Sequence, residues 1–141
     1  MNFLKNINWK ILLIGISIPV FFCILIQLSY ILEKINPVYG FILNLDTFIA
    51  FFLIFFASIF LAMFLKTNVK TGVLYGVFVG FISGIVIITI MTTLVLLTTP
   101  EVHSNQILTQ SFGVFIIISS IFQILTGSVG GALGSLLIKE G

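Results

Sequence analysis

Four long apolar runs, separated by short polar breaks, limit what this chain can fold into. They cover roughly residues 11–30, 45–65, 73–97 and 112–138 of the 141-residue sequence. A helix that crosses the hydrocarbon core of a bilayer needs about 20 residues, and each run is long enough. Because a helix satisfies its own backbone hydrogen bonds where water is absent, we expect an all-α fold, a four-transmembrane-helix bundle forming a single integral membrane domain, residues 1–141.

The composition supports the same prediction and excludes several classes of partner. Hydrophobic residues make up 60% of the chain and charged residues 7%, with a mean hydropathy of +1.32. A soluble domain carries about 25% charged residues, so water is not the main solvent of this chain. The net charge of +2 is too small and dispersed for nucleic acid binding. The expected partners are therefore the lipid bilayer and either a second copy of the chain or another membrane protein.

The distribution of lysines predicts the orientation of the spans. Five of the six lysines fall in segments on one side of the predicted bundle, namely Lys5, Lys10, Lys66, Lys70 and Lys139. Only Lys34 falls on the other side. Cytoplasmic segments of membrane proteins retain lysine, so we expect a multi-pass protein of the cell membrane with both termini in the cytoplasm.

Small residues at four-residue spacing mark the third and fourth runs. The predicted packing residues are Gly72, Gly76, Gly80 and Gly84 in the third run and Gly127, Gly131 and Ser135 in the fourth. Glycine costs about 1 kcal/mol relative to alanine inside a helix, so such a ridge indicates close packing against another helix. With a rise of about 1.5 Å per residue, both sets reach the same depth in the inner half of the membrane. We expect glycine-rich, antiparallel packing of helices 3 and 4, although one ridge facing a second copy is the alternative.

The second run is rich in phenylalanine on one side. Its rings are Phe48, Phe51, Phe52, Phe55, Phe56, Phe60 and Phe64, and most of them cover one broad helical face. Asp46, Ala50 and Ala57 fall on a narrow stripe roughly opposite. We expect the phenylalanine face to contact lipid and the narrow stripe to face the bundle.

Asp46 is the one acid close to a membrane-embedded position, and such residues are functional hypotheses by default. It could carry a proton or bind a transported cation, with Gln27, Gln123, Thr89 or Thr92 as polar neighbours. The alternative is structural, because an acid at the start of a helix caps free amides and meets the positive end of the helix dipole.

No reaction can be assigned from the sequence. Glu101 and His103 share one loop, but two ligands do not make a metal site. No serine has a nearby histidine and acid, and the glycines form helix ridges instead of a phosphate-binding loop. We therefore expect no catalytic residue, metal or cofactor, and a role in packing or interaction within the bilayer. The alternatives are a small transporter or channel that uses Asp46, and an enzyme subunit whose catalytic residues lie on a partner.

Three segments carry a resemblance to a known family. They are Ile7-Asn8-Trp9-Lys10 leading into Gly15, the Lys70-Thr71-Gly72 entry to the third run, and the closing Gly127-Ser128-Val129-Gly130-Gly131-Ala132-Leu133-Gly134. Over nearly its full length the chain resembles a family of small four-span membrane proteins of archaeal type, defined as a domain of unknown function. The resemblance implies the four-span fold and no activity. Four-span small multidrug transporters match in size, but the first run lacks the acid on which they rely.

Overall fold

The computed structural model describes residues 7–32, 45–98 and 106–140, except for the side chains of residues 30–31, 45–47, 95–96, 98, 106–112 and 140. These ranges form the helices α1 (Trp9–Leu32), α3 (Leu45–Phe64), α4 (Val69–Thr98) and α5 (Gln106–Glu140), and they contain no strand. The all-α fold predicted from the four apolar runs is confirmed.

Three of the described helices are long and apolar enough for a bilayer. Trp9–Ser29, Val69–Leu94 and Gly113–Lys139 are each long and apolar enough to cross a membrane. The stretch Phe48–Phe64 of α3 is a shorter apolar helix, although α3 as a whole has 20 residues. Length and composition therefore indicate a membrane protein. Both α4 and α5 begin several residues before the apolar runs that predicted them.

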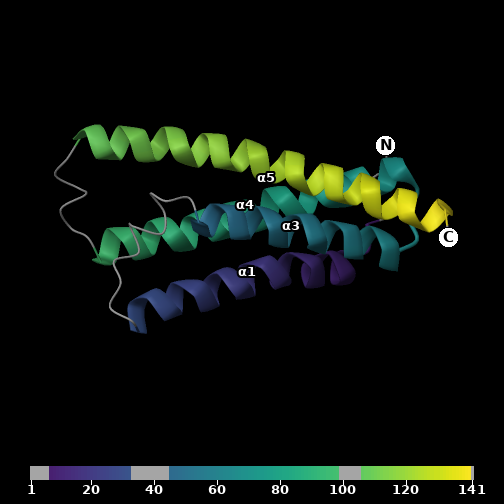
Figure 1. Ribbon diagram of the computed structural model, residues 1–141, viewed down its shortest axis with the longest axis horizontal. Helices are drawn as coiled ribbons and strands as arrows, with labels where there is room; N and C mark the ends of the chain where they lie inside the picture. Colours follow the sequence, from purple (N-terminus) through teal and green to yellow (C-terminus); the bar gives the residue numbers. More distant parts are fainter. Residues whose placement is uncertain (1–6, 33–44, 99–105, 141) are drawn as a thin grey trace.

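The four helices alternate in direction along the bundle (Figure 1). The most extensive contact is between α4 and α5, and α3 packs against both of them. The first helix contacts α3 and α4, whereas α1 and α5 make no contact within the described ranges. The glycine-rich packing of the predicted helices 3 and 4 is thus the contact between α4 and α5, and α1 lies on the opposite side of the α3–α4 pair.

Asparagine side chains cap the starts of two helices. Asn8 Oδ1 accepts a hydrogen bond from the Ile11 backbone N–H at 3.4 Å, and Asn68 Oδ1 accepts one from the Thr71 N–H at 2.9 Å. The first amides of a helix have no partner within the helix, and an asparagine just before the first turn satisfies one of them. These two caps fix where α1 and α4 begin.

A tight turn joins α3 to α4. The Lys66 N–H donates to the Met63 carbonyl at 3.1 Å, and the Thr67 N–H donates to the Ala62 carbonyl at 3.2 Å. This pair of bonds is the Schellman motif that ends many helices, and it requires a left-handed residue that is usually glycine. Lys66 occupies that position with a φ of 49°. The left-handed residue ends α3, and the chain reverses direction before α4 begins at Val69.

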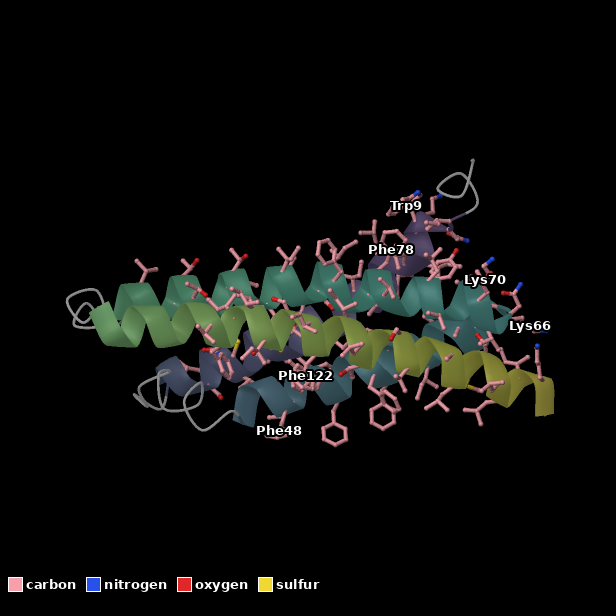
Figure 2. All side chains as sticks on the ribbon, turned by 90° about the horizontal axis from the view of Figure 1, so that it is seen from above. Trp9, Phe48, Lys66, Lys70, Phe78 and Phe122 are labelled. Carbon is pink, nitrogen blue, oxygen red and sulfur yellow. The ribbon has the colours of Figure 1, made fainter. Side chains whose placement is uncertain are left out.

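The phenylalanine face of α3 points away from the other helices. Phe48, Phe52, Phe56, Phe60 and Phe64 are exposed, and Figure 2 shows Phe48 on the outer side of the bundle. Ala50 and Ala57 are buried. The predicted orientation of α3 is therefore confirmed for its described side chains. Phe51 and Phe55 lie at the margin, and the Phe51 ring meets the Phe122 ring of α5 at 6.2 Å between centroids.

Candidate sites inside the helix bundle

The closest approach in the bundle is between the backbones of α4 and α5. A Cβ atom added to Gly76 would lie 2.7 Å from the carbonyl carbon of Gly127, and one added to Gly80 would lie 2.9 Å from that of Gln123. A Cβ on Gly131 would lie 2.7 Å from the carbonyl carbon of Gly72. Real side chains do not approach backbone atoms this closely, so these positions accept glycine alone without a shift of the helices. The two ridges lie back to back and within one chain.

Helix α5 places a second pair of glycines against α3. A Cβ on Gly130 would lie 2.6 Å from the Phe55 carbonyl oxygen, and one on Gly134 would lie 2.9 Å from the Ile59 Cα. Sequence reasoning did not assign these two glycines to a neighbour. Their own four-residue spacing, offset from the Gly127 ridge, is the signal that could have predicted a second helix contact.

Hydroxyl groups close the bundle near the α3–α4 turn. Thr67 Oγ1 and Ser135 Oγ lie 2.8 Å apart and share a hydrogen bond. Ser135 Oγ also lies 3.0 Å from the Gly131 carbonyl oxygen, to which it donates. Next to this pair, a Cβ on Gly72 would meet Ser135 Oγ and lie 3.0 Å from Thr67 Oγ1. Ser135 is therefore a packing residue that also ties the last turns of α5 to the α3–α4 turn.

Gly84 differs from the other glycines of its ridge. A Cβ atom there would meet the side chain of Gln123, whose Oε1 is the nearest atom and whose Cδ lies at 3.1 Å. Gly84 thus makes room for an amide and does not receive a neighbouring backbone.

Gln123 is a polar side chain in the middle of α5 that is only 2% exposed. Its Oε1 is buried, and no hydrogen-bond partner reaches it among the described residues. Thr92 Oγ1 on α4 is in the same condition. Burial of a polar atom without a partner costs about 1–3 kcal/mol. Each of these two atoms therefore marks a candidate site where a small polar group could form a hydrogen bond.

A small cavity adjoins Gln123 between α3, α4 and α5. Its volume is about 10 Å³, and its lining is mostly apolar. The lining residues are Ala50, Ile87, Ile88, Met91, Phe115, Ile116, Ser119 and Gln123. Among the lining residues that the structure describes, only Ser119 and Gln123 contribute polar side chains, and both come from α5.

A separate groove of about 400 Å³ lies between α1 and α4. It is lined by Ile24, Gln27, Leu28, Thr89, Ile90, Thr93 and Leu94. Thr89 Oγ1 donates to the Ile85 carbonyl and Thr93 Oγ1 to the Thr89 carbonyl, so both hydroxyl hydrogens are already used within α4. No described residue lines both this groove and the Gln123 cavity. Of the four side chains considered as neighbours of Asp46, Gln27 and Thr89 thus line the groove, Gln123 lines the cavity, and Thr92 lines neither.

The acidic candidate is located only through its backbone. Asp46 is the second residue of α3, one helical turn before Ala50, which lines the Gln123 cavity. The side chain of Asp46, and the whole of Asn44, Glu101 and His103, lie outside the described residues. Among the residues that the structure does describe, no group of three or more histidines, cysteines, aspartates or glutamates could hold a metal ion.

No protein-family model matches the chain, and neither a curated protein nor a solved structure shows significant similarity to it. The resemblance to a family of four-span membrane proteins therefore stays a prediction from the sequence.

Proposed function

We propose that this chain is a non-enzymatic integral membrane protein that acts by packing or interaction within the bilayer. The observation that supports the proposal most strongly is the contact between α4 and α5, where the Gly72, Gly76, Gly80, Gly127 and Gly131 backbones leave no room for a side chain. Lipid tails are as apolar as the helices, so no hydrophobic effect drives helices together in a bilayer. They associate instead through van der Waals packing, which close backbone contacts allow. The glycines along this contact therefore support a rigid, closely packed interior.

The proposed setting is the cell membrane, with both termini in the cytoplasm. In the structure, Lys10 near the start of α1, Lys66 and Lys70 around the α3–α4 turn, and Lys139 near the end of α5 belong to one end of the bundle, and Figure 2 shows Lys66 and Lys70 there. Trp9 packs edge-on against Phe78 near the same end, with ring centroids 6.1 Å apart. Lysine together with an amphipathic ring is typical of a cytoplasmic membrane interface.

The second candidate function is a small transporter or channel. The buried, unpartnered Gln123 Oε1 favours it, because polar groups within a span often mark a path for ions or protons. The separation of Gln27 and Thr89 from Gln123 weighs against a single continuous path. We therefore rank this function second.

Replacement of Asp46 separates the two candidates. In proteoliposomes with an imposed pH gradient, Asp46→Asn should abolish proton-dependent flux if the chain is a transporter, and Asp46→Glu should retain it because a titratable carboxyl remains. A packing protein should show no flux above empty liposomes for the wild type or either variant, with only a change in thermal stability for Asp46→Asn. Flux in the wild type that disappears in Asp46→Asn would overturn the packing proposal.

A second experiment tests whether the glycine ridge acts within one chain or between two copies. Gly80→Leu places a large side chain against the Gln123 backbone, so we expect a clear loss of thermal stability in detergent with no change in the mass of the assembly. An assembly that falls apart into stable single chains would instead show that the ridge joins copies.

A further inference from the structure

The side-chain oxygen of Gln123 is buried in the bundle without a hydrogen-bond partner among the described residues. The residue is 2% exposed and comes from the middle of α5. An amide oxygen can accept two hydrogen bonds. Burying an acceptor in an apolar interior without a donor costs free energy. Binding of a small donor that can reach Oε1 is therefore favourable.

The surrounding residues leave room for such a donor. Gln123 lines the cavity of about 10 Å³, and Gly84, which lacks a Cβ, accommodates the amide where it lies against α4. A cavity holds a water molecule when its volume is at least about 10–15 Å³ and two or more polar groups face it. Ser119 lies one helical turn before Gln123 and lines the same cavity, which supplies the second polar group.

We propose that this cavity binds one water molecule, which donates a hydrogen bond to Gln123 Oε1 and bonds to the hydroxyl of Ser119. The size of the cavity limits the site to a single water. A metal cation is a poor occupant, since hard cations take six or more oxygen ligands and this lining offers two polar side chains. The other described lining residues are apolar, so the water is held on the α5 side, and none of these residues lines the α1–α4 groove.

The site is testable in the full chain in lipid bilayers by solid-state NMR. Magnetisation selected on water protons is transferred to ¹³C-labelled side chains, and the Gln123 Cδ signal is assigned by its loss in Gln123→Met. We expect Gln123 to receive magnetisation several-fold faster than Ile54, which is fully buried and does not line the cavity. Equal, slow transfer to Gln123 and Ile54 would overturn the proposal.

A matched pair of serine variants tests the second partner. Ser119→Ala removes a hydroxyl from the cavity, so transfer from water to Gln123 should fall several-fold. Ser58→Ala is the control, because Ser58 is also buried, its hydroxyl donates to the Ile54 carbonyl at 2.7 Å, and it does not line the cavity. Unchanged transfer in Ser119→Ala would contradict a water held between the two side chains.

Discussion

At the scale of single residues, the glycines of this chain are not equivalent. Gly131 lies against the Gly72 backbone, whereas a Cβ on Gly113, on the same helix, would meet no atom of another helix within 4 Å among the described residues. A glycine of the first kind is required by a neighbour, and one of the second kind only adds backbone freedom to the unfolded chain. The same substitution should therefore have opposite effects at the two positions.

Gly131→Ala should lower the free energy of unfolding by about 1–3 kcal/mol, because the added methyl group forces α4 and α5 apart. Gly113→Ala, its control, should leave stability unchanged or raise it by about 0.5–1 kcal/mol. Unfolding in mixed detergent micelles, followed by circular dichroism, measures both. Equal effects of the two substitutions would contradict a packing role for Gly131.

Lys66 is a second residue whose backbone decides its role. A side chain in the left-handed region costs about 1–2 kcal/mol, and glycine removes most of that cost. We expect Lys66→Gly to raise the free energy of unfolding by about 0.5–1 kcal/mol. Lys70→Gly, in the first turn of α4, should instead lower it by about 1 kcal/mol or less. A loss of stability in Lys66→Gly would show that the lysine side chain matters more than the turn.

At the scale of helices, α5 is the element that organises the bundle. Gly127 and Gly131 face α4, Gly130 and Gly134 face α3, and the described part of α5 makes no contact with α1. Two glycine ridges on one helix allow two neighbours to approach closely at once. The end of α5 is then held to the α3–α4 turn by the bond between Thr67 and Ser135.

A disulfide tests this arrangement of α5 and the turn. The hydroxyl oxygens of Thr67 and Ser135 lie 2.8 Å apart, so we expect the sulfur atoms of cysteines at both positions to come close enough to form a disulfide. In a Cys23→Ser background, Thr67→Cys with Ser135→Cys should lose both free thiols under mild oxidation, as measured by mass after thiol labelling. The control pair, Thr67→Cys with Leu136→Cys, should keep them, because Leu136 is exposed on another face. Equal oxidation of both pairs would contradict the described packing.

At the scale of the whole molecule, the lysines that the structure describes gather at one end, and exposed phenylalanines cover the outer face of α3. The lysine end includes the start of α1, the α3–α4 turn and the end of α5 (Figure 1). Moving a charge across the membrane is energetically unfavourable, so we expect this end to stay on the side from which the chain inserts.

Labelling of single cysteines in intact cells measures this orientation. In a Cys23→Ser background, Lys66→Cys should react with a membrane-impermeant maleimide only after the cells are made permeable. Glu101→Cys, in the segment between α4 and α5, should react in intact cells. The reverse pattern would place the lysine end outside.

The sequence by itself determined the local features of this protein. Apolar runs of about 20 residues become helices because their backbone groups have no other partner in lipid. The exposed Phe48 face and the buried Ala50 and Ala57 follow from helical periodicity alone, which needs no knowledge of neighbours. The ridges of Gly76 and Gly131 likewise indicated that backbones meet there.

Only the tertiary structure decided which surfaces meet. Gly130 and Gly134 face α3, and Gly84 faces the Gln123 amide, because the rotation of each helix about its axis depends on all its neighbours together. For the same reason Gln27 and Gln123, which look alike in the sequence, lie in separate places. Spacing along a helix fixes the face that a residue shares with others, but contacts between distant helices fix what that face touches.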